Sequence, residues 1–330
     1  MKKAYLLAMI MMIMAIFIAA CSMPKVGLLR ETPDPLKEYT LEGTGADKIL
    51  LIAINGVISD QPKKGLFAKH PSLVEQVVMQ LNKAEKDRQI KAVLFKINSP
   101  GGTITASDIL YHEISFYRQK TGNKTAVSML DVAASGAYYI SLPADVIMAH
   151  PTTVTGSVGV ISLQPKFKGL MDKIGVGVDV QKTGKYKDMG SPYRESAEDE
   201  KKLMQKAMDN FGQRFLDLVK KHRNLSAQAL AEISTARIFL TDEALELGLI
   251  DKVGYISDAI KETKKLAKLP EEARVVVYRR AEFPEDNYYN IAGSFSEHLN
   301  ISLVNLELPE ILNSRAGFYY LWPGAISVER

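Results

Sequence analysis

One serine of the chain lies among small residues in a pattern that suits a nucleophile. Ser135 stands in the run Asp-Val-Ala-Ala-Ser-Gly-Ala-Tyr-Tyr, where a predicted strand at 126–130 gives way to a predicted helix at 135–141. A serine hydroxyl at such a junction can attack a carbonyl group, and the N–H group of Gly136 would then point toward the carbonyl oxygen. The alternative interpretation is that Ser135 only caps the helix, because serine is a favoured N-cap residue.

A glycine pair upstream could stabilise the negative charge that such an attack creates. Gly101 and Gly102 follow Ser99-Pro100, between a predicted strand at 92–97 and a predicted helix at 106–117. Glycines let the backbone approach a ligand closely, and N–H groups near a helix start can bind a developing oxyanion. The same four residues could equally form an ordinary tight turn from strand to helix.

A lysine cluster downstream offers a general base. Lys182, Lys185 and Lys187 lie in the run Lys-Thr-Gly-Lys-Tyr-Lys-Asp. A lysine can accept a proton from serine when burial lowers its pKa by a few units from about 10.4. Serine–lysine pairs of this kind are a known variant of the catalytic triad. Taken alone, the cluster also fits a solvated loop.

The order of these motifs resembles the SppA family of signal peptide peptidases. The chain carries SPGG, AASGAYYIS, TGSVGVIS and TGKYKDMGSP in succession, followed by LGLIDKVG, and the resemblance covers about residues 48–266. It implies that Ser135 is the nucleophile and that Lys187, the lysine of Tyr-Lys-Asp, is the general base, with Lys182 and Lys185 in reserve. The implied oxyanion donors are the N–H groups of Gly101 or Gly102 together with that of Gly136.

The resemblance also carries expectations about fold, assembly and substrate. It implies the α/β fold of the Clp protease and crotonase superfamily, in which stacked ββα units build a largely parallel sheet. The single set of motifs matches the short form of the family. That form assembles into homo-oligomeric rings, in which the lysine reaches the serine of a neighbouring protomer. The implied substrates are extended, largely apolar peptides, notably signal-peptide remnants, and no cofactor is implied.

Two positions depart from the family pattern. Gly136 is followed by Ala137 where the family commonly has a second glycine, so we expect a narrower site floor. A Gly-Arg pair of the family is Ala236-Arg237 here, which puts the conformation of a turn in question.

The elements that must position these residues alternate between strands and helices. Such alternation predicts an α/β domain with a largely parallel sheet. Ser72 and Glu75 have the spacing of a capping box at the start of one helix. The remaining expected strands are at 48–54, 146–149, 158–162, 176–181 and 273–278, and the remaining expected helices at 166–174, 198–223 and, as additional C-terminal helices, within 227–267.

The N-terminus has the pattern of an exported lipoprotein. Two lysines precede an uncharged run from Ala4 to Ala20, and Cys21, the only cysteine, follows Ile-Ala-Ala as in a lipobox. We expect lipidation of Cys21 and anchoring to a membrane on the periplasmic side of the cell envelope. The alternative is an uncleaved short anchor. The predicted organisation is a signal peptide at 1–20, a tether at 21–47, a peptidase domain at 48–266 and a C-terminal extension at 267–330.

Composition and histidine positions exclude several other classes. The net charge of +4, from 42 basic and 38 acidic residues, is too small to indicate nucleic-acid binding. No Cys/His group has metal-ligand spacing, so no metal site is predicted. His150 is an alternative base, because related Clp proteases use Ser-His-Asp. Two other functions stay open: an acyl-CoA enzyme like the crotonases, and an inactive envelope scaffold.

Overall fold

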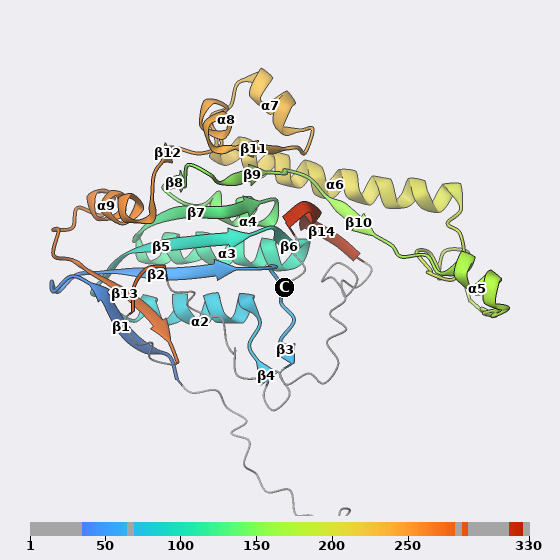
Figure 1. Ribbon diagram of the computed structural model, residues 1–330, viewed down its shortest axis with the longest axis horizontal. Coiled ribbons are helices and arrows are strands. Elements are labelled where there is room, and N and C mark those ends of the chain that lie inside the picture. Colours follow the sequence, from blue (N-terminus) through green and yellow to red (C-terminus); the bar gives the residue numbers. More distant parts are fainter. Residues whose placement is uncertain (1–34, 65–68, 281–285, 290–316, 326–330) are drawn as a thin grey trace, which may run out of the picture. The chain divides into compact units, whose positions relative to one another are not determined.

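The centre of the protein is a nine-stranded, largely parallel β-sheet, seen in a computed structural model that describes residues 35–64, 69–280, 286–289 and 317–325 (Figure 1). Its main path runs in the order β1-β13-β2-β5-β7-β8-β12. Two more strands, β9 and β11, extend it from β7. Among these strands only the pairs β1–β13 and β9–β11 are antiparallel. The bounds are β1 Lys37–Glu42, β2 Lys48–Asn55, β5 Ile90–Ser99, β7 Lys124–Ala134, β8 Val146–Ala149, β9 Val154–Gly156, β11 Ile238–Leu240, β12 Lys252–Val253 and β13 Arg274–Arg279.

Both faces of the central strands are buried. In β2 the run Lys-Ile-Leu-Leu-Ile-Ala-Ile is buried throughout, as is typical of a parallel strand covered by helices on both sides. Alternate residues face opposite cores: Leu50 and Ile52 join the larger one, whereas Ile49 and Leu51 join the smaller. Burial on both faces fixes the register of the sheet, since a shift by one residue would exchange the two sets of side chains.

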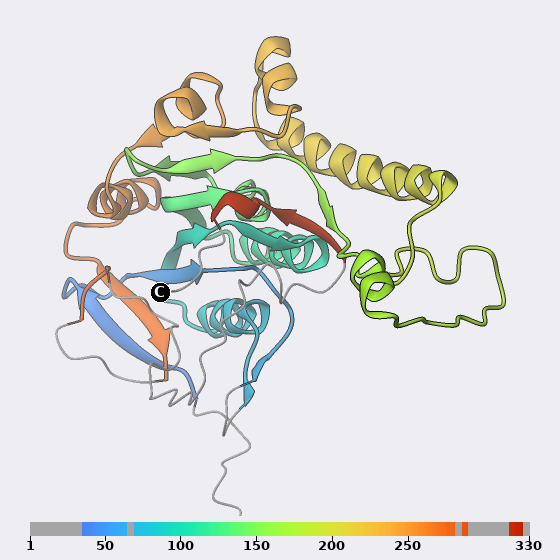
Figure 2. The same ribbon diagram turned by 45° about the vertical axis from the view of Figure 1, so that its right-hand side comes forward.

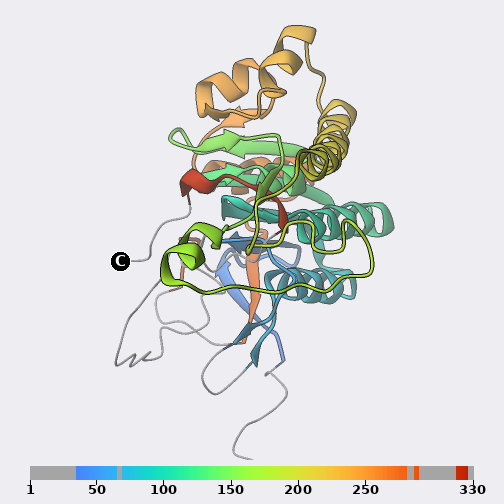
Figure 3. The ribbon, with the colours of Figure 1, turned by 90° about the vertical axis from the view of Figure 1, so that its right-hand side faces the viewer.

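The helices divide between the two faces in the same way. Figure 3 shows α2, α3 and α6 on one side of the sheet, where with α4 they cover the larger core. Helix α9 packs against the smaller core. The expected capping box starts α2: Ser72 accepts from the N–H of Glu75, and Glu75 accepts from the N–H of Ser72. The helix bounds are α2 Leu73–Glu85, α3 Ile104–Thr121, α4 Gly136–Ser141, α5 Lys168–Ile174, α6 Glu198–His222, α7 Ala227–Ile233, α8 Thr241–Glu246 and α9 Ile256–Leu266.

A second, three-stranded sheet lies against the first. Its order is β10-β14-β6, with β6 at Gly101–Thr103, β10 at Ile161–Leu163 and β14 at Gly317–Leu321. Both pairings in it are antiparallel. Strands β5 and β6 with helix α3 form one of the expected ββα units, so the predicted α/β architecture is confirmed.

Several expectations about single elements were wrong. Residues 176–181, which were predicted to form a strand, are exposed and pair with no described strand. The predicted strand 158–162 is replaced by β9 and β10 on either side of a loop. The folded part begins before Lys48, because β1 pairs with β13 and its Tyr39 packs on the smaller core. Two strands of the predicted C-terminal extension, β13 and β14, are part of the sheets.

The turn at Ala236 keeps a conformation that favours glycine. Its φ is 59°, in the left-handed region, at a cost of roughly 1–2 kcal/mol for a residue with a side chain. The turn that the sequence put in question is therefore formed with alanine, under strain.

Two parts of the chain stand apart from this description. Strands β3 (Lys63–Lys64) and β4 (Lys69–His70) form an antiparallel hairpin that belongs to a separate compact unit. The expected signal peptide and Cys21 lie outside the described residues.

Candidate active site

Ser135 lies at a sharp turn between β7 and α4. Its φ of 54° and ψ of −116° are strained for a residue with a side chain, which costs on the order of 1–3 kcal/mol. The surrounding backbone holds the turn: the N–H of Ser135 donates to Gly156 O at 2.8 Å, and the N–H of Tyr139 donates to Ser135 O at 2.9 Å. Strain of this kind at a strand-to-helix turn is typical of a nucleophile.

The hydroxyl of Ser135 is buried and has no hydrogen-bond partner. The residue is 1 % exposed, and no described residue gives its Oγ a hydrogen bond. Its side chain makes no capping hydrogen bond to α4. Ser135 therefore occupies the N-cap position of α4 without capping the helix through its side chain. An unsatisfied buried hydroxyl is costly, so its retention at this position indicates a role other than stability.

The glycine pair of the SPGG motif lies directly beside this turn. A Cβ on Gly136 would be 3.1 Å from Gly102 N, and a Cβ on Gly101 would be 2.7 Å from Gly136 N. The φ of Gly101 is 99°, which also requires glycine. A Cβ on Gly102 would be 1.9 Å from Ile58 O. Close backbone approach thus requires glycine at 101 and 102, and a Cβ on Gly136 would in addition be 2.4 Å from Ser107 Oγ. The two motifs lie side by side in the structure.

The two donors of the glycine pair differ in availability. Gly101 N already donates to Ser99 Oγ at 3.1 Å. That bond leaves Gly102 and Gly136 as the better-placed pair of N–H groups. The sequence could not show which of Gly101 and Gly102 is the oxyanion donor, because it does not reveal that the Ser99 hydroxyl accepts from Gly101 N.

Lys187 lies in a different environment from Ser135. It belongs to the segment between α5 and α6, which with α5 projects beyond the edge of the main sheet (Figures 1 and 2). Its side chain is exposed, and its N–H donates to Gly184 O at 3.2 Å. No hydrogen bond joins it to Ser135 within the described chain, since the Ser135 hydroxyl has no partner.

The other two lysines of the cluster are held in ion pairs. Lys182 binds Asp188 at 2.6 Å, and Lys185 binds Asp199. Among these three lysines, Lys187 alone has no carboxylate partner in the described residues. This difference favours Lys187 as the lysine that is available for chemistry.

A charge network fixes the backbone beside Lys187. Arg194 binds Asp188 through Nε at 2.8 Å and Glu200 through Nη2 at 2.5 Å. Hydrogen bonds from Arg194 and Lys182 hold the pKa of Asp188 well below its usual range. The residue after Lys187 is therefore anchored, while Lys187 itself points to solvent.

His150, the alternative base, does not form a dyad with Ser135 in the described structure. His150 Nδ1 bonds Thr152 Oγ1 at 2.8 Å, and its ring packs edge-on against Tyr255 at 4.9 Å. Its ring has no hydrogen bond to Ser135, whose hydroxyl is unpartnered. Within the described residues no group of histidines, cysteines and carboxylates could hold a metal ion.

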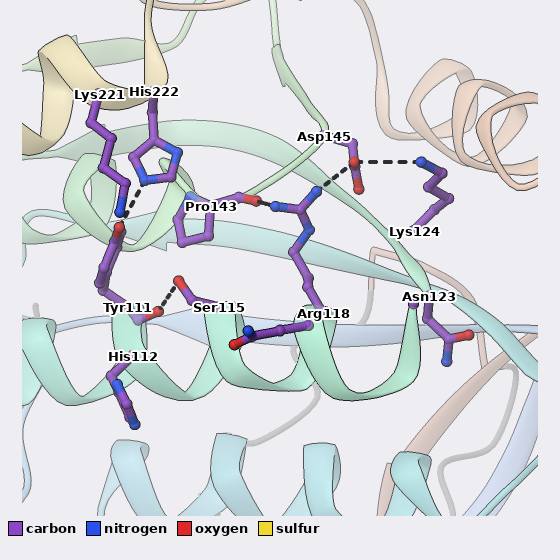
Figure 4. A pocket seen from close by; sticks show the side chains of 12 residues that line it. Tyr111, His112, Ser115, Arg118, Asn123, Lys124, Pro143, Asp145, Lys221 and His222 are labelled. Atoms are coloured by element: carbon purple, nitrogen blue, oxygen red, sulfur yellow. Dashed lines mark hydrogen bonds and ion pairs between the residues drawn. The ribbon is translucent and has the colours of Figure 1, made fainter.

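A pocket of about 440 Å³ lies elsewhere, along the C-terminal half of α3 (Figure 4). Figure 4 shows His222 bonded to the hydroxyl of Tyr111, and Arg118 paired with Asp145. Ser135 does not line this pocket. The Arg118–Asp145 pair ties α3 to the start of β8.

The sequence missed one element of this region, strand β14. It lies between β6 and β10, so that a C-terminal segment runs along the glycine pair (Figures 1 and 2). The run Gly-Phe-Tyr-Tyr-Leu is rich in residues that favour strands, and this was the available signal. Among the helices that the structure describes, none has the length and apolar character needed to cross a bilayer.

Comparison with known proteins places these observations in a family. Residues 117–270 match the model of peptidase family S49. A protein of Enterococcus faecium described as a candidate signal peptide peptidase SppA is 37% identical over 245 residues, which cover 74% of this chain and 71% of that protein. A candidate protease of Methanocaldococcus jannaschii is 34% identical over 271 residues, 82% of this chain and 84% of the relative. Protease 4 of Haemophilus influenzae is 31% identical over 271 residues, 82% of this chain and 42% of the relative.

A solved structure is similar at a looser level. A mutant of ClpP1 from Listeria monocytogenes aligns with 64% of this chain and 94% of its own, at 19% identity and a TM-score of 0.41. A score this low does not by itself establish a shared fold. The α/β assignment therefore depends on the parallel sheet described above and on the sequence relatives.

Proposed function

The chain belongs to peptidase family S49 and is a serine peptidase, and we propose that Ser135 is its nucleophile and Lys187 its general base. The observation that carries the proposal is the strained, buried and unpartnered Ser135 beside three glycines at which a Cβ would clash with neighbouring atoms. The relatives named as proteases make an acyl-CoA enzyme the poorer alternative.

The proposed mechanism uses backbone donors and one lysine. Lys187 in its neutral form takes the proton from Ser135 as Oγ attacks the peptide carbonyl, and the N–H groups of Gly102 and Gly136 stabilise the oxyanion. The C–N bond then breaks, and the leaving amine takes the proton from the lysine. Water activated by the same lysine hydrolyses the acyl-enzyme and restores Ser135.

We further propose that Lys187 serves the Ser135 of a neighbouring protomer in a homo-oligomeric ring. The segment that carries Lys187 supports this, because it presents apolar side chains to solvent. Phe167, Leu170, Ile174 and Val176 are between 49 and 62 % exposed, and α5 has no buried residue. Apolar surface of this kind is stabilised by a partner, and assembly would also remove Lys187 from solvent.

The proposed substrates are extended apolar peptides, including signal-peptide remnants, which fits the name of the Enterococcus relative. A lipid anchor at Cys21 would hold the enzyme at the membrane surface where such peptides are left. Cys21→Ser should release the protein from washed membranes into the soluble fraction. Tight membrane association of this variant would instead support an uncleaved N-terminal anchor.

Labelling with a serine-reactive fluorophosphonate tests the nucleophile. The label should map to Ser135 by mass spectrometry and should be absent from Ser135→Ala. Ser157→Ala is the matched control, because Ser157 is also largely buried and has a positive φ of 49°. If an active preparation were labelled at another serine, the assignment of Ser135 would be wrong. If no serine were labelled, the result would favour an inactive scaffold.

A further inference from the structure

One carboxylate oxygen joins three helices, one of which directly follows the proposed nucleophile. Asp108 Oδ1, in the second turn of α3, accepts a hydrogen bond from the hydroxyl of Tyr139 in α4 at 2.6 Å. The same oxygen accepts from Arg214 of α6 at 2.7 Å. All three helices also contribute residues to the larger core. Asp108 therefore cross-links elements that are far apart in the sequence.

Two of these helices carry the proposed oxyanion donors. Gly102 lies two residues before the start of α3, and Gly136 is the first residue of α4. The two N–H groups therefore keep their separation only if α3 and α4 keep theirs. Oxyanion donors are effective when they are held, before the reaction begins, about 3 Å from the place where the charge develops.

Helix α4 depends on its surroundings for its position. It has only six residues, and a helix of this length is not stable alone. Its first turn is closed by Tyr139, whose N–H donates to Ser135 O at 2.9 Å. Tyr139 thus bonds the nucleophile through its backbone and Asp108 through its side chain, so a shift of Asp108 reaches Ser135 through a single residue.

The hydroxyl of Tyr139 is well suited to this link. The residue is fully buried, and its ring packs edge-on against Tyr111 of α3 at 5.4 Å and Phe215 of α6 at 4.9 Å. Burial and the bond to Asp108 raise the pKa of Tyr139 well above its ordinary value, so its hydroxyl stays a donor. Arg214 is 56 % exposed, and an ion pair at such a site contributes little to stability. Its place on the oxygen that Tyr139 uses suits a role in orienting the carboxylate.

We propose that Asp108 is a positioning residue of the peptidase, which acts through Tyr139 to set the distance between the oxyanion donors of α3 and α4. Arg214 holds the carboxylate in the required orientation. The inference rests on the proposed role of Ser135 as nucleophile. Since Asp108 acts through Tyr139 and not on the substrate, its loss should slow the chemical step and leave substrate binding nearly unchanged.

Tyr139→Phe is the mildest test, because it removes the hydroxyl and keeps the ring in the core. Its kcat for a fluorogenic peptide should fall by about three- to tenfold, while KM changes by less than about twofold. Asp108→Ala should lower kcat by about tenfold or more, again with little change in KM. Should Asp108→Ala fail to fold, Tyr139→Phe still decides the question.

A conservative substitution should restore part of the activity. The amide oxygen of Asp108→Asn can still accept from Tyr139, so this variant should have a higher kcat than Asp108→Ala. Arg214→Gln should lower kcat less than Asp108→Ala, because the bond between Asp108 and Tyr139 is kept. If Asp108→Asn were as slow as Asp108→Ala, the hydrogen bond to Tyr139 would not be the cause of the effect.

Arg118→Gln is the matched control for a loss of stability. It removes the ion pair with Asp145 from the last turn of α3, and so weakens the same helix at the end away from the glycine pair. This variant should have a lower melting temperature and an unchanged kcat. The inference would be wrong if Arg118→Gln lowered kcat as much as Tyr139→Phe at the same melting temperature.

The rate of fluorophosphonate labelling separates this inference from the proposed catalysis. The phosphoryl oxygen of the probe takes the place of the carbonyl oxygen at the oxyanion donors, so labelling of Ser135 should slow by about the same factor as kcat. If Ser135→Ala kept full activity, the proposed function would fail and this inference with it. If Ser135→Ala were inactive, but Tyr139→Phe labelled and cleaved as fast as the unchanged chain, the positioning role alone would be wrong.

Discussion

The two halves of the proposed site differ in how the fold holds them. Ser135 is 1 % exposed and is fixed by backbone hydrogen bonds and by glycines that admit no Cβ. Lys187 is exposed on a segment that begins with a helix lacking buried residues. The nucleophile is thus built into the core of one protomer, whereas the base is presented at its surface.

This difference supports the proposal that the catalytic unit includes a neighbouring protomer. A lysine in water keeps its proton at neutral pH, so it can act as a base only after something desolvates it. A neighbouring protomer that buried the exposed apolar side chains of α5 and the segment after it could also desolvate the lysine. Assembly would then make Lys187 able to act as a base, while the conformation of Ser135 would stay the same.

The strongest test of this difference places the intact nucleophile and the intact base on different protomers. Ser135→Ala and Lys187→Ala should each lower the cleavage rate by about 10³-fold or more. When the two variants are mixed in equal amounts before assembly, about a quarter of the activity should return. In a random ring, half of the sites have an intact Ser135, and in half of these the neighbouring protomer supplies an intact Lys187. The measurement is peptide cleavage by the re-assembled mixture. A site contained in one protomer predicts no recovery.

Lys185→Ala is the control for that experiment. Lys185 is two residues away but is paired with Asp199, so its loss should leave most of the activity. If Lys185→Ala abolished cleavage and Lys187→Ala did not, the base would have to be reassigned.

Glycine substitutions compare the rigidity of the two halves. Gly101→Ala should lower the free energy of unfolding by about 3 kcal/mol or more, because its φ is 99° and the new Cβ would be 2.1 Å from Tyr320 O. Gly184→Ala, close to Lys187, has no atom within 4 Å of the new Cβ and should change it by less than about 0.5 kcal/mol. Chemical denaturation measures both. Equal effects would mean that the segment near Lys187 is packed as tightly as the core.

The smallest expected effect is a pH dependence of stability that comes from His222, at the end of α6. Burial lowers the pKa of His222 below its ordinary 6.5, with Lys221 and Arg118 adding to the shift. Below pH 6.5 His222 is therefore protonated more readily in the unfolded chain than in the folded chain. The free energy of unfolding should consequently fall as the pH decreases from 6.5. The melting temperature should drop by about 1–2 °C between pH 7 and 5.5. His222→Gln, which can keep the bond to Tyr111, should remove this slope, and an unchanged slope would exclude His222 as its cause.

The sequence predicted those parts of the molecule in which local pattern and tertiary packing agree. The buried strand at 48–54 and the capping box at Ser72 and Glu75 were both found, because apolar runs and cap spacing are local signals. Ser135 was correctly placed at a strand-to-helix junction. Its strained backbone was not visible in the sequence, since φ depends on the contacts around the turn.

Errors arose where a strand needs a distant partner. The alternation of Val176, Val178 and Val180 predicted a strand, yet these side chains are between 47 and 50 % exposed and no described strand lies beside them. Strand β14 was missed for the converse reason. It is a short segment whose partners, β6 and β10, lie more than a hundred residues earlier, and its place in the sheet is set by their free edges.

The place of β13 in the sheet has a consequence for the order of folding. β13 lies between β1 and β2, so the first strand of the sheet has no neighbour until Arg274–Arg279 has been synthesised. Such long-range pairing slows folding, because the loop must close before the contacts form. The edge strand β1 therefore docks late, after the chain through β13 has been synthesised. Late docking of β1 would suit the export and lipidation proposed for the N-terminal segment.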